Sequence, residues 1–116
     1  MELTEYQTRC KSTAVYSEQN YHGERIAYLA LALCGEAGEL ANVVKKVVRA
    51  KGMLAATLEF SDSDSESEAR LKLRDELGDV LWYLASLARE AGFTLDEIAY
   101  QNLDKLAKRY ANAPAH

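Results

Sequence analysis

Two short segments of the sequence each place a pair of acidic residues in the middle of an apolar helical stripe. The segments are G35-E-A-G-E39 and R74-D-E-L-G-D79, and their paired acids are Glu36 with Glu39 and Glu76 with Asp79. At about 100° per residue, each pair lies on one helix face among leucine, valine and tyrosine side chains. Unpaired buried charge is very costly, and no basic residue lies on either stripe between the acids. A bound metal ion is the simplest counter-charge.

The ligand set is all oxygen, which predicts Mg²⁺, with Mn²⁺ as a substitute. Residues three apart on a helix are neighbours, so two facing helices can bring all four carboxylates to one spot. No histidine belongs to the set, because His22 lies in an expected connection between helices and His116 lies near the end of the sequence. That disfavours zinc, and it disfavours a di-iron bundle, which uses Glu-x-x-His motifs.

Polar and basic residues complement the acids. Asn102, Lys105 and Arg109 share one face of the last expected helix, and Lys46 projects close to the angle of Glu39 two turns later. Metal ions together with lysine and arginine fit a polyphosphate substrate, because the metals bind phosphate oxygens and the cations neutralise the remaining charge. The alternative for Lys105 and Arg109 is a solvated helix end, which the helix dipole favours.

The elements that position these residues are predicted to be helical throughout. The only proline is Pro114, so nothing breaks the interior of the chain. Four helices are expected, over about residues 3–18, 24–50, 66–91 and 94–110. Thr94 and Glu97 predict a capping box, and Gly92 suits the end of the third helix. The predicted fold is all-α, a single four-helix-bundle-like domain over residues 1–116.

The connection between the second and third helices is expected to be an acidic loop over about residues 53–68. Its second half, Ser61 to Glu68, alternates serine with aspartate and glutamate, which predicts a solvated connection. The alternative is a lid over an active site, but its negative charge would oppose an anionic ligand.

Two features of the helices predict contacts with something outside them. The third expected helix is apolar on nearly every side between Leu77 and Leu87, so the bundle is expected to oligomerise through it. Gly35, Gly38 and Gly78 flank the acids although glycine inside a helix costs about 1 kcal/mol relative to alanine. They predict close approach of a backbone, a metal or a substrate.

Composition limits the classes of function. Of the 116 residues, 48% are hydrophobic and 28% are charged, which is typical of a soluble globular protein. The net charge is -4, and the four acids account for it, so the remaining surface is near neutral and disfavours binding to nucleic acid. No uninterrupted apolar run reaches about 18 residues, and the start of the sequence lacks a signal-peptide pattern. A cytoplasmic protein without membrane contact is expected.

Three segments resemble, in order, the MazG-like nucleoside triphosphate pyrophosphohydrolases of the all-α NTP pyrophosphatase superfamily. They are G35-E-A-G-E-L-A-N-V-V-K-K46, R74-D-E-L-G-D-V-L-W-Y-L-A85 and N102-L-D-K-L-A-K-R-Y110. The family signature is Glu-x-x-Glu followed by Glu-x-x-Asp on neighbouring helices, and the opening L3-T-E-Y-Q7 is similar to the family's first helix. One departure is the separation of about 36 residues between the two acid pairs, which is longer than is common.

The resemblance implies hydrolysis of a (deoxy)nucleoside triphosphate to the monophosphate and pyrophosphate by a dimer or tetramer. Glu36, Glu39, Glu76 and Asp79 would hold Mg²⁺, and Glu36 or Glu39 would help to deprotonate the attacking water. Asn102, Lys105 and Arg109 match the family's C-terminal substrate-binding pattern. The residues considered for contact with the base are Tyr6, Gln7, Tyr21, His22 and Trp82. A purine, as in dGTP, is the expected base.

Three alternatives stay open on the sequence. A non-catalytic helical interaction or regulatory module on the same scaffold is disfavoured by the intact acid quartet. A metal-storage or di-iron bundle is disfavoured by the absence of ligand histidines. A pyrophosphohydrolase that prefers pyrimidine deoxynucleotides differs from the favoured function only in its base.

Overall fold

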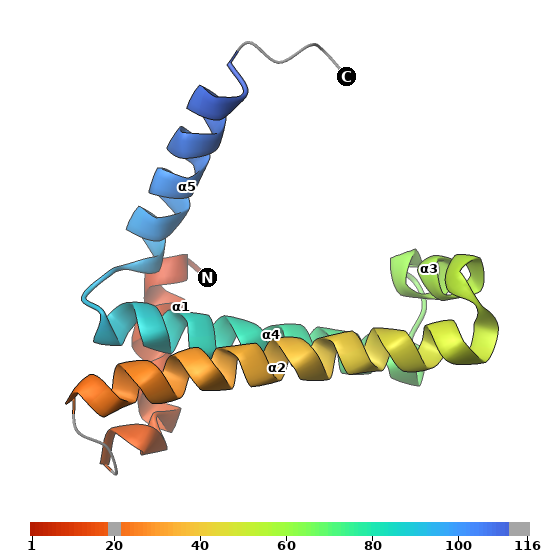
Figure 1. Cartoon of the computed structure of the whole chain (residues 1–116), viewed down its shortest axis with the longest axis horizontal. Coiled ribbons are helices and arrows are strands. Elements are labelled where there is room, and N and C mark those ends of the chain that lie inside the picture. Colours follow the sequence, from red (N-terminus) through yellow and green to blue (C-terminus); the bar gives the residue numbers. More distant parts are fainter. Residues whose placement is uncertain (19–21, 112–116) are drawn as a thin grey trace. The chain divides into compact units, whose positions relative to one another are not determined.

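All regular structure in the computed structural model, which describes residues 1–18 and 22–111, is helical. The helices in chain order are α1 (Leu3–Arg9), α2 (His22–Lys51), α3 (Met53–Ser61), α4 (Glu68–Glu90) and α5 (Leu95–Arg109), with two 3₁₀ turns, Cys10–Thr13 and Val15–Glu18, between α1 and α2 (Figure 1). The described residues include no strand, so the predicted all-α fold class is confirmed.

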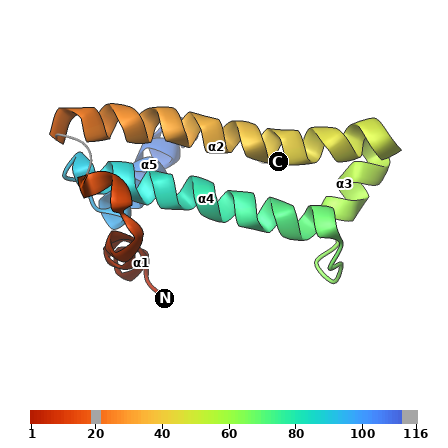
Figure 2. The same ribbon diagram turned by 90° about the horizontal axis from the view of Figure 1, so that it is seen from below.

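The chain forms two compact units. Unit 1 comprises Met1–Ile26 and Ala85–His116. It therefore contains α1, the part of α4 that begins at Ala85, and the whole of α5. Unit 2 comprises Ala27–Leu84, and so contains most of α2, all of α3 and most of α4. Within unit 2, α2 and α4 run side by side in opposite directions and α3 joins them at one end (Figures 1 and 2). This antiparallel pair of helices carries both acidic motifs.

The expected loop over residues 53–68 is wrong for its first half, which forms α3. Gly52 ends α2 in the left-handed region, with φ +88°, where glycine is strongly favoured. The Gly52 amide donates to Val48 O at 2.8 Å and the Gly52 carbonyl accepts from Ala56 N at 3.1 Å, so the chain turns directly from α2 into α3. The sequence M53-L-A-A-T-L-E-F60 then contains mostly good helix formers. Only residues 62–67 connect α3 to α4.

The expected first helix over residues 3–18 is also wrong beyond Arg9. The Ser12 hydroxyl donates to Arg9 O at 2.9 Å and the Thr13 hydroxyl donates to Cys10 O at 3.2 Å. Serine and threonine compete in this way with the bonds of the α-helix. The chain therefore continues in 3₁₀ turns rather than in α1.

In unit 1, the buried amide of Gln7 ties α1 to α4 and α5. Its Nε2 donates to Ala85 O at 3.2 Å and to Phe93 O at 2.9 Å, and its Oε1 accepts from Leu95 N at 3.1 Å. Burial of this side chain is tolerated because three polar partners replace water. Gln7 therefore fixes the start of α5 against the end of α4.

The two predicted helix ends around this junction are confirmed. Gly92 has φ +83°, and the Phe93 amide donates to Ala88 O at 2.8 Å, which is the pattern of a Schellman motif after α4. The Thr94 hydroxyl accepts from Glu97 N at 3.1 Å, and the Glu97 carboxylate accepts from Thr94 N at 2.7 Å. Together they form the expected capping box of α5.

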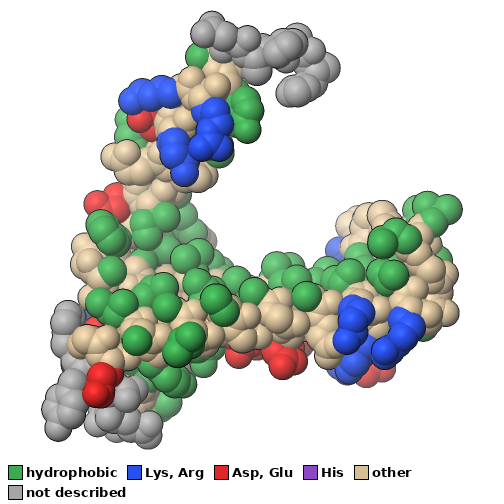
Figure 3. Space-filling model, viewed as in Figure 1, with side chains coloured by type: hydrophobic (Ala, Val, Ile, Leu, Met, Phe, Trp, Pro, Cys, Tyr) green, Lys and Arg blue, Asp and Glu red, His purple; other side chains and the backbone are tan. Residues whose placement is uncertain are grey.

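Unit 2 has only a small core of its own. Its buried hydrophobic residues are Leu29, Val47 and Ala56, whereas Leu31 is 74% exposed and Leu77 is 51% exposed. Hydrophobic side chains lie at the surface along the α2–α4 pair and over α3 (Figure 3). The pair of helices therefore forms one layer whose apolar faces are only partly covered within this chain.

Among the described residues, one helical segment, Gly23–Lys51, is long and apolar enough by length and composition to cross a membrane, because an 18-residue stretch of it has a mean hydropathy of 1.3. The sequence argument from uninterrupted apolar runs did not find it. Glu36 and Glu39 lie near the middle of this segment, where a bilayer would make charged side chains costly. The segment is weak evidence for a membrane span.

The glycines beside the acids make no close contact within the described chain. At Gly35, Gly38 and Gly78, no atom lies within 4 Å of the position that a Cβ would take. The described residues therefore do not themselves make the close approach that these glycines predict.

We expect Gly92→Ala to destabilise the protein by about 1 kcal/mol, because alanine is strained at positive φ. The matched variant Gly78→Ala, in the interior of α4, should stabilise the metal-free protein by roughly 0.5–1 kcal/mol, because alanine favours the helix and meets no neighbour. Urea unfolding of both variants measures the difference. A loss of stability in Gly78→Ala would show that another molecule packs against that position.

Candidate metal centre

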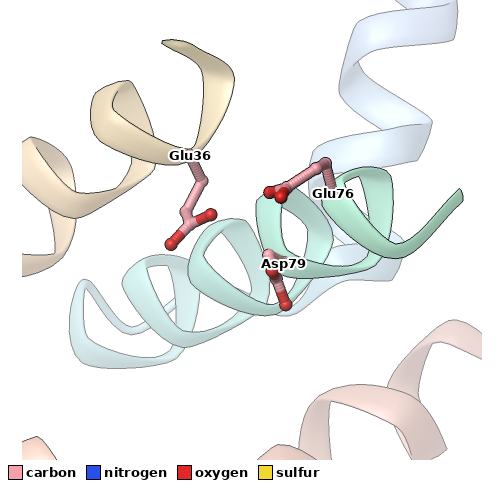
Figure 4. A group of neighbouring side chains, drawn as sticks. All are labelled: Glu36, Glu76 and Asp79. Carbon is pink, nitrogen blue, oxygen red and sulfur yellow. The ribbon is translucent and has the colours of Figure 1, made fainter. Parts of the chain in front are cut away.

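Three carboxylates from two helices converge in unit 2. Glu36 comes from α2, and Glu76 and Asp79 come from adjacent positions on one face of α4. One oxygen from each carboxylate lies within 4.8 Å of the other two, and the Glu36 and Glu76 side chains extend toward each other beside Asp79 (Figure 4). Antiparallel packing of α2 and α4 thus places three acidic ligand groups around one point.

Burial, together with the neighbouring carboxylates, raises the pKa of Glu36. Burial contributes most, followed by the negative charge of Asp79 and then by Glu76, which adds both its charge and a hydrogen bond to Glu36. Among the described residues, no lysine or arginine forms an ion pair with these acids. In the absence of a cation, protonation is the remaining way to relieve the repulsion.

The Glu76 carboxylate fits a bound cation. Its Oε2 atom is buried and has no hydrogen-bond partner in the described structure. A buried acceptor without a partner costs roughly 1–3 kcal/mol, and more when it is charged. Since Glu36 and Asp79 contribute only carboxylate oxygens beside it, the ligand chemistry of this group fits a hard divalent cation such as Mg²⁺ or Mn²⁺.

Glu39 is the one predicted ligand that lies outside this group of three. It lies one turn beyond Glu36 on α2 and its side chain is exposed. Its charge nevertheless contributes to the raised pKa of Glu36, so the two carboxylates interact. The structure thus brings three of the four predicted ligands together and leaves the fourth at the edge of the centre.

Tyr83 is a neighbour of the metal centre that the sequence argument did not select. Its pKa is raised, first by burial, then by the charge and hydrogen bond of Tyr28, and further by Glu36 and Asp79. The Trp82 ring meets Tyr83 edge to face at 5.0 Å between ring centroids. The sequence did hold a signal for Tyr83, because it follows Asp79 by one helical turn and so lies on the same face of the helix. It places a phenol hydroxyl beside the acids.

Three of the predicted substrate-binding residues lie on α5 in unit 1, and the fourth lies on α2 in unit 2. Asn102 and Lys105 line a cavity of about 540 Å³ in unit 1, together with Phe93 and Ile98. Arg109 is exposed in the last turn of α5 and does not line that cavity. Lys46 lines a different cavity, of about 360 Å³, in unit 2.

The residues considered for base contact have varied surroundings. Gln7 has a structural role, because its amide is engaged with three backbone groups. Tyr6 lies half-buried in α1, and Trp82 is half-buried against Tyr83. Tyr21 and the side chain of His22 lie outside the described residues. The surroundings of the described candidates do not single out any of them as a residue that contacts the base.

Comparison with known proteins gives two matches and one negative result. A profile of the MazG nucleotide pyrophosphohydrolase domain matches residues 25–113, a range that includes all four acids and α5. The chain is 37% identical over 111 residues to the Gene 37 protein of Mycobacterium phage L5, which covers 94% of this chain and 89% of that protein. No solved structure matches the chain.

Glu36→Gln should change how the stability of the chelator-treated protein depends on pH. Because the pKa of Glu36 is higher in the folded than in the unfolded state, its stabilising contribution is present at low pH and is lost as pH rises through the folded pKa. The wild-type free energy of unfolding should therefore fall over that range, and Glu36→Gln should show less of this fall.

Urea unfolding between about pH 4 and 8, in the presence of a chelator, measures this difference. Glu66→Gln, at an exposed position between α3 and α4, serves as the control and should follow the wild type. An equal loss of stability in Glu36→Gln at every pH would contradict the crowding of carboxylates described above.

Proposed function

The chain belongs to the MazG nucleotide pyrophosphohydrolase family, and we propose that it hydrolyses a (deoxy)nucleoside triphosphate to the monophosphate and pyrophosphate with Mg²⁺. The observation that carries this proposal is the convergence of Glu36, Glu76 and Asp79 around a buried carboxylate oxygen without a partner. A scaffold that served only for interaction would have no need to retain such a costly cluster.

The acids in this proposal hold Mg²⁺ and manage the proton of the attacking water. When bound, Mg²⁺ would supply positive charge to the phosphate oxygens and would lower the pKa of a coordinated water. Glu36, Glu76 and Asp79 would hold the ion, and Glu39, which is exposed one turn from Glu36, would act as the base. Water attacks the α-phosphorus, the bond to the α–β bridging oxygen breaks, pyrophosphate leaves and Glu39 takes the proton.

Residues outside the acid cluster bind the rest of the substrate in this proposal. Asn102, Lys105 and Arg109 on α5 neutralise and orient the phosphates, whose charge increases on the leaving pyrophosphate. The Tyr83 hydroxyl, close to Glu36 and Asp79, is a further donor for a phosphate oxygen. The expected base is a purine, as in dGTP. A protein of this family is soluble, and we propose the cytoplasm as its location.

The exposed apolar faces of unit 2 support a homodimer or homotetramer. Leu77, Leu81 and Leu84 are exposed on α4 at spacings of four and three residues, which places them on one stripe. Leu31 on α2 is also exposed, and the core of unit 2 is small. A second copy of the chain would cover these faces, and its cover would explain why α2 is apolar without crossing a membrane.

The experiment that tests the proposed activity is chromatography of the products from a panel of (deoxy)nucleoside triphosphates with Mg²⁺. We expect monophosphate and pyrophosphate in equal amounts. Glu76→Gln should reduce the rate by more than roughly 10- to 100-fold, which is the typical loss when a residue that only hydrogen-bonds to a metal ligand is replaced. Glu66→Gln should leave the rate unchanged. Diphosphate with orthophosphate as products would instead show cleavage at the γ-phosphate and a different class of reaction.

Sedimentation velocity tests the oligomer. The wild type should sediment as a dimer or tetramer at micromolar concentration, and Leu81→Glu should shift it toward smaller species because the charge is placed in the apolar stripe. Val15→Glu, which changes an exposed hydrophobic residue in unit 1, is the control and should keep the wild-type mass. A monomeric wild type would contradict the proposed assembly.

A further inference from the structure

The 360 Å³ cavity of unit 2 has a volume in the range of small-molecule pockets. It lies between α2, α3 and α4, and its apolar walls are Val43, Val47, Ala50 and Ala69. Lys51, at the end of α2, and Glu59, on α3, form part of its polar lining. None of these six residues belongs to the acid cluster.

Along both α2 and α4, the cavity lies between the metal centre and the end of the helix nearer α3. At a rise of 1.5 Å per residue, Val43 lies about 10 Å along α2 from Glu36, and Ala69 lies about 10 Å along α4 from Glu76. Because α2 and α4 are antiparallel, both displacements run toward α3 (Figure 2). A nucleotide whose α-phosphate lies at the acids can therefore extend its nucleoside toward this cavity.

The lining favours a base over a polyphosphate. Two of the three lysines in the lining are already paired, since Lys51 Nζ lies 3.1 Å from Glu59 Oε2 and Lys72 Nζ lies 3.5 Å from Glu68 Oε1. The two glutamates would repel phosphate, whereas the four aliphatic walls suit the faces of an aromatic ring. The cavity therefore fits the uncharged end of a nucleotide.

The Lys51–Glu59 pair presents an ordered polar edge to this cavity. The Glu59 side chain is only 15% exposed, whereas that of Lys51 is 53% exposed. Lys51 above all, and Ser67 to a lesser degree, hold the pKa of Glu59 below its ordinary value against the opposing effect of burial. An ionised carboxylate only accepts hydrogen bonds and an ammonium group only donates them. Because Glu59 Oε2 is buried and paired with Lys51, the edge consists of the Lys51 donor and the acceptor Glu59 Oε1.

We propose that this cavity is the base pocket and that the Lys51–Glu59 pair recognises the Watson–Crick edge of guanine. Lys51 donates to guanine O6, and Glu59 Oε1, the oxygen that is not paired with Lys51, accepts from guanine N1–H and N2–H. Adenine and cytosine present an amino donor where guanine presents O6, and thymine and uracil can pair once with each partner but lack the second donor of guanine. Guanine is therefore the base that satisfies the whole edge. This inference rests on the proposed function, whose substrate it specifies.

The experiment measures binding separately from hydrolysis. Isothermal titration with dGMP, dIMP and dAMP in Mg²⁺ compares bases that differ stepwise at this edge, because hypoxanthine keeps O6 and N1–H but lacks the 2-amino group. We expect wild-type affinity to fall about 10- to 100-fold from dGMP to dIMP, since one hydrogen bond to a charged acceptor is lost, and to fall further to dAMP. Similar affinities for dGMP and dAMP would overturn the proposal.

Variants of Lys51 and Glu59 test whether this pair causes the preference for guanine. Glu59→Gln should reduce the difference between dGMP and dIMP to within about threefold, and Lys51→Met should weaken dGMP and dIMP equally, because both have lost the partner of O6. Glu5→Gln, which removes an acid from an exposed pair on α1 with an N–O distance of 3.7 Å, should keep the wild-type order. Full selectivity in Glu59→Gln would overturn the assignment, and if that variant fails to fold, the wild-type series and Lys51→Met still decide it.

The two proposals can fail separately. Hydrolysis of all nucleoside triphosphates at similar rates, with similar affinities for the three monophosphates, would leave the proposed function standing and remove the base pocket. Selective binding of dGMP without hydrolysis of dGTP would support the base pocket and refute the proposed reaction.

Discussion

Repulsion among three carboxylates is the constraint on which the rest of this structure depends. Glu36, Glu76 and Asp79 approach within 4.8 Å of one another, and the described chain supplies no basic partner and no donor for the buried oxygen of Glu76. Helix geometry brings them together, since Glu76 and Asp79 are one turn apart on α4 and α2 runs beside them. The arrangement makes physical sense when a divalent cation completes it.

The same two helices, α2 and α4, also limit how many side chains unit 2 can bury. The α2–α4 pair provides a straight frame for the acids, but it is a single layer with few fully buried side chains. Function and assembly are therefore connected, because the helices that hold the acids also present the apolar stripes proposed to meet a second copy. Unit 1 has a different construction, in which the buried amide of Gln7 links three helices through their backbone.

Features that depend on local sequence were predictable. The all-α class, the end of α4 at Gly92 and the capping box at Thr94 each follow from spacings of a few residues, and the structure confirms them. The convergence of three acids was predictable because helical phase alone places them on facing stripes. The exposed position of Glu39 was not, because it depends on how α2 is turned against α4.

What the sequence argument missed depends on the turn at Gly52. The loop expected there hid α3, because a nine-residue apolar segment beside an acidic stretch gives little periodicity. Without α3, Glu59 has no place in the site and its pairing with Lys51 could not be anticipated. The same holds for the pair of Tyr28 and Tyr83, which meet only after α2 and α4 pack together.

Binding of Mn²⁺ to the chelator-treated protein, followed by the electron paramagnetic resonance signal of free Mn²⁺, tests the central claim most directly. The account predicts that the wild type removes Mn²⁺ from solution, that Mg²⁺ competes for the same site, and that Glu76→Gln and Asp79→Asn bind at least about tenfold more weakly. If both folded variants bind Mn²⁺ as tightly as the wild type, the three carboxylates are not the metal centre and the account is wrong.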